Sequence, residues 1–157
     1  MTTRLKKAGK FTTIGAAAIA LIGVWEGVRT TAYRDIVGIP TVCFGETRGV
    51  KMGDKYTLAE CKEMLGDAVI EFEQGIRKCL KSPDKIPDEV YVTSLSLSYN
   101  IGQSAFCKST VARRLNEGNF RAACNAISLF NKAGGKVSKG LINRRAEEKK
   151  ICLEGLK

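Results

Sequence analysis

Apolar residues recur along the chain at two different spacings, which separate helical from extended segments. Between residues 58 and 79 they recur in steps of three and four, the spacing of an amphipathic helix. Thr57 followed by Glu60 has the pattern of a capping box at its start, and Pro83 and Pro87 interrupt the chain after its end. The sequence therefore predicts one long helix at this position.

The second half of the chain predicts shorter elements. Residues 109–116, 119–130 and 141–153 read as helices separated by glycine-containing turns. Residues 90–99, VYVTSLSLSY, instead alternate between apolar and polar types, and this periodicity alone predicts a strand. The chain contains no sign of an internal repeat or of a second domain.

The first 25 residues combine a basic flank with an uncharged run. Residues 1–10 contain four Lys or Arg side chains, whereas the fifteen residues 11–25 are uncharged. As a helix this run would be about 22 Å long, shorter than the roughly 30 Å hydrocarbon layer of a membrane. The arrangement is typical of an export signal, although no small-residue cleavage site follows it. We therefore expect residues 1–25 to form a weak signal-anchor segment in front of a domain of residues 26–157.

Another interpretation makes residues 11–25 the first helix of a soluble domain. Ile19, Leu21 and Ile22 would then pack into the core. The two interpretations are compatible, because an anchor that leaves the membrane can refold as that helix.

Polar side chains with catalytic potential lie in residues 25–47, WEGVRTTAYRDIVGIPTVCFGET. Glu26 ends the apolar run, and the turn-forming and β-branched residues after it predict a hairpin that carries Asp35 and Thr41. A carboxyl group at a helix end that faces another on a hairpin is the arrangement that glycoside hydrolysis needs. Each residue also has a simpler interpretation: Glu26 as a solvated charge, Asp35 as a turn residue bonded to its own backbone, and Thr41 as an ordinary strand residue.

Composition narrows the classes of protein. A chain of 157 residues with 44% hydrophobic residues fits one folded domain. The absence of histidine weighs against Ser-His or Cys-His catalysis and against a zinc site with histidine ligands. We expect neither a cofactor nor a metal.

The formal net charge of +10 indicates an anionic partner, such as nucleic acid, a membrane surface or an acidic cell-wall polymer. Basic pairs occur at 113–114, 144–145 and 149–150, although such pairs are also common on solvated helix faces. No nucleic-acid-binding motif accompanies them, so we do not expect a nucleic-acid partner.

The six cysteines form an even set without the CxxC spacing of a metal site. In an exported chain they indicate disulfides, for which fifteen pairings exist, whereas in a cytosolic chain they would be buried thiols. None lies in the first 25 residues, which argues against activation by thiol exchange with the anchor. We expect the pairs Cys43–Cys61, Cys79–Cys107 and Cys124–Cys152.

The spacing Glu-x8-Asp-x5-Thr within WEGVRTTAYRD and GIPTVCFGET resembles the phage-type muramidases of glycoside hydrolase family 24. The likeness covers residues 20–155 and includes YTLAECKEML, LSYNIG, STVARRLNEGNFRAACNAI and AGGKVSKGLINRRAEEKKICLEG. One departure is Glu46, because the family often has Gly-His-Thr where this chain has Gly-Glu-Thr.

This resemblance implies an α+β, lysozyme-like fold of two lobes. A small β-sheet lobe and a larger helical lobe would be joined by the long helix, with the active cleft between the lobes. Residues 90–99 would then be the central buried helix of the second lobe, against their strand-like periodicity.

The resemblance also implies hydrolysis of the β-1,4 bond between N-acetylmuramic acid and N-acetylglucosamine, with inversion. Glu26 would be the general acid, kept protonated by partial burial. Asp35 would stabilise charge at the anomeric carbon and orient water, which the Thr41 hydroxyl would hold. Some relatives form an anhydro sugar by transglycosylation instead, but Asp35 and Thr41 favour hydrolysis. Substrate contacts are predicted for Tyr33, Asn100 and Arg145.

The N-terminus resembles that of signal-arrest-release endolysins. This implies a monomer that the host exports, that residues 11–25 tether to the inner membrane, and that depolarisation releases into the periplasm to lyse the cell. The alternative is a non-catalytic protein that binds membrane or cell wall through its basic charge.

Overall fold

The computed structural model describes all residues, Met1–Lys157. Its helices are α1 (Thr13–Glu26), α2 (Leu58–Arg77), α3 (Asp88–Ile101), α4 (Gln103–Cys107), α5 (Thr110–Asn116), α6 (Phe120–Ala126) and α7 (Lys139–Glu154), with short 3-10 turns η1 (Pro83–Lys85) and η2 (Ile127–Leu129). Its strands are β1 (Lys6–Lys7), β2 (Lys10–Phe11), β3 (Arg29–Arg34), β4 (Pro40–Cys43), β5 (Lys132–Ala133) and β6 (Lys136–Val137). The strands pair consecutively as three antiparallel hairpins.

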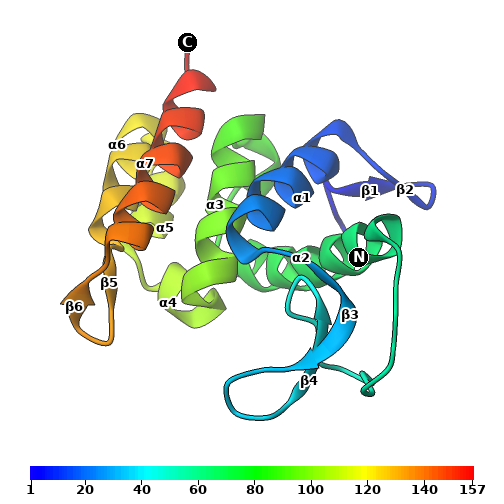
Figure 1. The fold of residues 1–157 in the computed structure, drawn as a ribbon. Helices are drawn as coiled ribbons and strands as arrows, with labels where there is room; N and C mark the ends of the chain where they lie inside the picture. Colours follow the sequence, from blue (N-terminus) through cyan, green and yellow to red (C-terminus); the bar gives the residue numbers. More distant parts are fainter.

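The predicted two-lobed α+β fold is confirmed. Figure 1 shows the β3–β4 hairpin and its following loop on one side of α2, and the bundle of α3 to α7 on the other. A cluster of 25 buried apolar residues fills the helical side, whereas the sheet side has a separate cluster of only four, so the two lobes have separate cores.

Helix α2 joins the lobes and begins with the predicted capping box. The Glu60 backbone N–H donates to the Thr57 hydroxyl at 3.0 Å, and the Thr57 N–H donates to the Glu60 carboxylate at 2.9 Å. Two backbone donors at the helix start are thereby satisfied, which fixes where the connecting helix begins.

Residues 90–99 are helical, as the family resemblance implies and against the periodicity. Every residue from 90 to 98 on α3 is buried, so the helix has no polar face to leave an amphipathic signal. Two of its serine hydroxyls bond within the helix: those of Ser94 and Ser98 donate to the carbonyls of Val90 and Leu95.

Residues 1–25 pack with the rest of the chain in this conformation. The buried side of α1 includes Ala18, Ile19 and Ile22, and Leu5 from the basic flank lies in the same core at 1% exposure. None of the helices combines the length and the hydropathy that crossing a membrane requires.

All three expected disulfide pairs are present. Cys43–Cys61 joins β4 to α2, Cys79–Cys107 joins the end of α2 to α4, and Cys124–Cys152 joins α6 to α7. The links therefore fasten the sheet lobe to the connecting helix and close the helical lobe at two points.

Candidate active site

Glu26 is the last residue of α1 and projects from the helical lobe. Gly27 ends the helix in a left-handed conformation with φ of 73°, which glycine adopts without strain. The Glu26 side chain is 26% exposed, and its Oε2 lies 3.8 Å from Nη1 of Arg144. Burial raises the pKa of Glu26, while the positive charge of Arg144 opposes the rise. The net result is a carboxyl group that holds its proton to a higher pH than an ordinary glutamate does.

Arg144 is itself held in place by a buried network. Its Nε lies 3.4 Å from Oε2 of Glu148, and its Nη2 donates to the Ser96 carbonyl at 3.3 Å. Glu148 is fully buried, and the Ser96 hydroxyl donates to it. Since Arg144 is one turn before Glu148 on α7, the last helix fixes the cation beside the carboxyl group of the first.

The prediction that Arg145 contacts substrate does not fit its position. Its side chain is 2% exposed and lies within 2.7 Å of Glu148 in the core. Adjacent helical residues point about 100° apart, so only Arg144 of this pair is directed toward Glu26. Sequence reasoning missed Arg144, although its spacing of four from Glu148 marks an ion pair on one helix face.

Asp35 lies at the turn between β3 and β4. Its Oδ1 accepts the backbone N–H groups of Val37 and Ile39, each at 2.9 Å. The simpler interpretation of Asp35 as a turn residue is therefore correct in part. Its second oxygen, Oδ2, accepts no hydrogen bond from the protein and is left for a water or a substrate group.

Thr41 is 4% exposed on β4, opposite Tyr33 on β3. Its hydroxyl donates to the Ile39 carbonyl at 2.9 Å. With its proton engaged there, the oxygen retains lone pairs that accept a hydrogen bond. Asp35 and Thr41 thus both act as acceptors on the same hairpin.

The other two predicted substrate contacts lie in different surroundings. The Tyr33 ring is covered by the Arg29 guanidinium at 4.1 Å. Asn100 is exposed at the end of α3 and borders a hollow of about 500 Å³, within the size range of ligand sites. Both assignments remain predictions.

Comparison with known proteins identifies the family. The phage lysozyme family model matches residues 23–148. The chain belongs to the phage lysozyme family. It is therefore a glycoside hydrolase that degrades peptidoglycan, as predicted.

Individual relatives agree with this assignment. The SAR-endolysin of Pseudomonas phage phiKMV is 43% identical, with 88% of each chain covered. A lysozyme of phage P22 superposes with a TM-score of 0.79 at 35% identity, covering 87% of this chain and 94% of that one.

The P1 phage endolysin Lyz is known in two forms. Its active form superposes with a TM-score of 0.78 at 25% identity, covering 90% of this chain and 85% of that one. Its secreted inactive form superposes with a TM-score of 0.58 at 19% identity, covering 93% and 97%. The arrangement of elements described here is closer to the active form.

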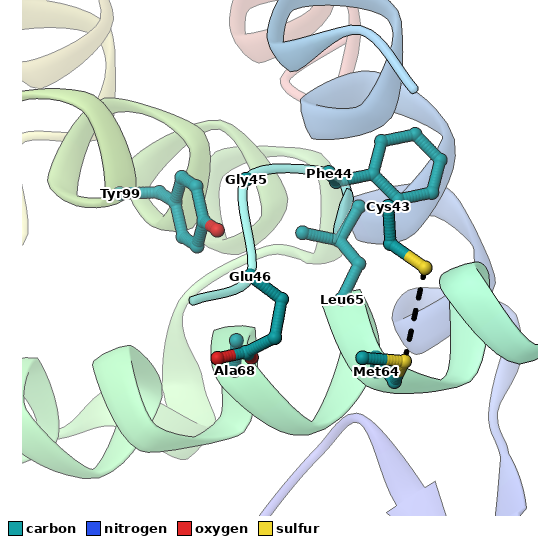
Figure 2. A pocket seen from close by; sticks show the side chains of 8 residues that line it. All are labelled: Cys43, Phe44, Gly45, Glu46, Met64, Leu65, Ala68 and Tyr99. Carbon is teal, nitrogen blue, oxygen red and sulfur yellow. Dashed lines mark hydrogen bonds between the residues drawn. The ribbon is translucent and has the colours of Figure 1, made fainter. Parts of the chain in front are cut away.

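Glu46, the residue at which the sequence departs from the expected Gly-His-Thr pattern, lines a small pocket between the sheet lobe, α2 and α3. Figure 2 shows the Glu46 side chain directed along α2 toward Ala68, and the Tyr99 hydroxyl facing the loop. The pocket holds about 40 Å³, room for a few waters rather than a sugar ring.

Glu46 does not act as a further acid. Burial works to raise its pKa, but Arg48 and two backbone N–H groups outweigh burial and hold the pKa below its ordinary value. Arg48 also lies 2.9 Å from Glu71 on α2. At position 46 this lysozyme therefore has an ionised carboxylate that braces the loop.

Tyr99 connects this pocket to the Glu26 neighbourhood. Burial raises the pKa of its hydroxyl, and the negative charges of Glu26 and Glu46 raise it further. Its ring packs on Phe72, with ring centroids 4.8 Å apart. The phenol is therefore a neutral donor between the two lobes, which sequence reasoning did not single out.

Proposed function

We propose that Glu26 is the general acid of this lysozyme and protonates the oxygen of the β-1,4 bond between N-acetylmuramic acid and N-acetylglucosamine. A general acid must hold a proton near neutral pH and present it to the leaving group. Partial burial supports the first requirement, because it raises the pKa of Glu26. Exposure of a quarter of the side chain supports the second.

Asp35 and Thr41 are proposed to orient the attacking water from the hairpin. A water that donates one hydrogen bond to Asp35 Oδ2 and another to Thr41 Oγ1 directs a lone pair at the anomeric carbon. The carboxylate also stabilises the positive charge that develops there and accepts the proton that the water loses as it bonds to that carbon. In this proposal water displaces the leaving sugar directly and with inversion, and a carboxyl separation of roughly 6.5–9.5 Å is typical of enzymes that do so.

The observation that carries this mechanism is the Glu26–Arg144 environment, and Glu26→Gln tests it. The variant keeps the size of the side chain but has no acidic proton. We expect peptidoglycan hydrolysis to fall by about 10²–10⁴-fold, with an unchanged melting temperature. Glu147→Gln, an exposed change on α7, is the matched control and should retain activity. Undiminished release of reducing ends by Glu26→Gln would refute the assignment.

We further propose that the host exports the chain, which residues 11–25 tether to the inner membrane before its release into the periplasm as a monomer. The support is the composition of α1 between its two ends: the exposed positions from residue 14 to residue 25 are Ala16, Ala17, Ala20 and Val24, none of which is polar. A helix that is apolar all round suits a membrane better than a protein surface. The name SAR-endolysin of the phiKMV relative agrees with this proposal.

Cell fractionation before and after depolarisation tests the tether. We expect membrane-bound, inactive protein first, and soluble, active protein within minutes of adding an uncoupler. While residues 11–25 lie in the bilayer, Glu26 is held away from the hairpin, so activity should be absent. Full muramidase activity in the membrane fraction would contradict this proposal.

A further inference from the structure

A second buried carboxyl group, that of Glu73 on α2, contacts the first residues of the chain, whose N-terminus is marked in Figure 1. Glu73 is completely buried and accepts three hydrogen bonds: from the Thr3 hydroxyl, from the Arg4 backbone N–H at 2.9 Å, and from the Tyr91 hydroxyl. Two of its three donors therefore come from residues that precede it by about seventy positions.

The Arg4 side chain fills a site that the helical lobe forms after α2. Its guanidinium donates to the carbonyls of Pro83 and Ile86 at 2.9 and 2.8 Å and pairs with Asp88 at 2.7 Å. It also lies over the Tyr91 ring, 4.2 Å from the centroid. Carbonyls, a carboxylate and an aromatic face together match the donors and the flat cation of an arginine.

The next residue joins this segment to the start of α1. Leu5 is buried in the main core, and its carbonyl accepts the Thr12 N–H at 2.9 Å. The backbone of Leu5 lies so close to α1 that a Cβ on Gly15 would stand 2.1 Å from its oxygen. The flank and the helix therefore fit each other closely, and glycine is required at the contact.

Without this segment, Glu73 would lose two of its three hydrogen bonds and keep only the Tyr91 hydroxyl as a donor. Hydrogen bonds to a charged group contribute more than neutral ones, so the site is incomplete until residues 3 and 4 enter it. Burial also raises the pKa of Tyr91, with Glu73 adding to the rise, so the phenol stays protonated as the third donor.

We propose that residues 2–6 are an intramolecular ligand for a socket formed by Glu73, Tyr91, Asp88 and the carbonyls of Pro83 and Ile86. Docking of this ligand holds α1 in the folded domain after the chain leaves the membrane. This inference rests on the proposed tether: while residues 11–25 span or enter the bilayer, the basic flank stays on the cytoplasmic side and the socket is empty.

Docking has a direct connection to activity because α1 carries Glu26 at its other end. Occupation of the socket fixes the start of the helix, and core packing then fixes its end. It also opposes return of the apolar helix to the membrane, so release becomes effectively one-way.

Arg4→Ala and Lys7→Ala form a matched pair for the test. Each removes one positive charge from the flank and so has the same effect on export. Only Arg4 contacts the socket, whereas Lys7 is exposed. In purified full-length protein, we expect Arg4→Ala to speed thermolysin cleavage before residue 13 at least tenfold and to lower the melting temperature by about 4 °C or more. Lys7→Ala should match the wild type.

In cells, Arg4→Ala should delay lysis after depolarisation and allow part of the protein to return to the membrane when the potential is restored. Glu73→Gln, which changes the socket and leaves the flank intact, should act in the same direction. Equal behaviour of Arg4→Ala and Lys7→Ala in the purified protein would overturn the docking. If the purified wild-type protein shows normal docking but cell fractionation never finds it in the membrane, the tether is refuted, together with the role in release that depends on it.

Discussion

The two lobes hold their catalytic candidates by different means. Glu26 ends a helix whose inner side belongs to a core of 25 buried residues, and Arg144 beside it is fixed by the buried Glu148. Asp35 lies on a hairpin whose lobe has a core of four residues. Packing therefore positions the acid, and the hairpin must be positioned in another way.

Backbone hydrogen bonds and one covalent link position the hairpin. Two N–H groups fix Asp35 in its turn, the Ala32 N–H donates to the Asp54 carbonyl at 2.8 Å, and Cys43–Cys61 fastens β4 to α2. The tip beyond them is exposed, with Ile36 fully open to solvent. We infer that the helical lobe determines the stability of the enzyme and that the sheet lobe determines the precision of its water-orienting groups.

Among the variants that separate the structural role of Asp35 in the turn from its proposed catalytic role, Asp35→Asn is expected to have the largest effect. The amide oxygen still accepts the two backbone N–H groups, so the turn is preserved, but the negative charge that we propose to act at the anomeric carbon is lost. We expect kcat to fall by about 10²–10⁴-fold with an unchanged melting temperature.

Asp54→Asn is the matched control for this prediction. Its carboxylate also accepts a backbone N–H, that of Lys51 at 2.8 Å, in the same lobe. It should keep nearly full activity. Equal losses in the two variants would mean that Asp35 serves the turn alone.

Removal of individual disulfides should show more directly which lobe determines global stability and which positions Asp35 and Thr41. Replacing Cys124 and Cys152 by alanine opens a 28-residue loop in the large core and should cost about 3 kcal/mol of global stability. Activity at 25 °C should remain, because the site residues keep their packing.

The corresponding change at Cys43 and Cys61 should have the opposite pattern. It frees the small lobe, so amide exchange of Val42 and Glu46, which pair with each other, should accelerate by about 10²-fold while the global melting temperature changes less. Activity should fall as well, because the freed lobe carries Asp35 and Thr41. A larger loss of global stability here than at Cys124–Cys152 would contradict the comparison.

Much of the fold could be predicted from local patterns. The capping box at Thr57 and Glu60 and the three- and four-residue spacing after it gave the connecting helix to within two residues. Periodicity missed the helix α3 because the helix is buried on all sides, with Ser94 and Ser98 bonded to its own carbonyls and Ser96 bonded to Glu148 on α7, so the alternation of apolar and polar residues arose by chance. Only the family resemblance corrected that prediction.

Candidate site residues could be proposed from the sequence where chemistry follows from residue spacing, and not where it follows from long-range packing. Glu26, Asp35 and Thr41 stand out within sixteen residues. The choice between Arg144 and Arg145 depends on how α7 is rotated against α1 and α3, which the core decides. The contact of Arg4 with Asp88 depends on a chain separation of 84 residues, which no local pattern records.

The smallest expected effect is a change in pH dependence on replacing Arg144 by glutamine. Burial raises the pKa of Glu26 and Arg144 lowers it, so loss of the cation should raise it further. The acid then stays protonated to higher pH, and the alkaline limb of kcat/KM should move upward with little change in the maximum. The pKa of Glu26 is higher in the folded state than in the unfolded chain. Its contribution to the free energy of unfolding is therefore fully present below the ordinary glutamate pKa and is lost as the pH rises through the raised pKa. Arg121→Gln, an exposed change, should leave the limb in place. A downward shift in Arg144→Gln would show that Glu26 is not the group that sets this limb.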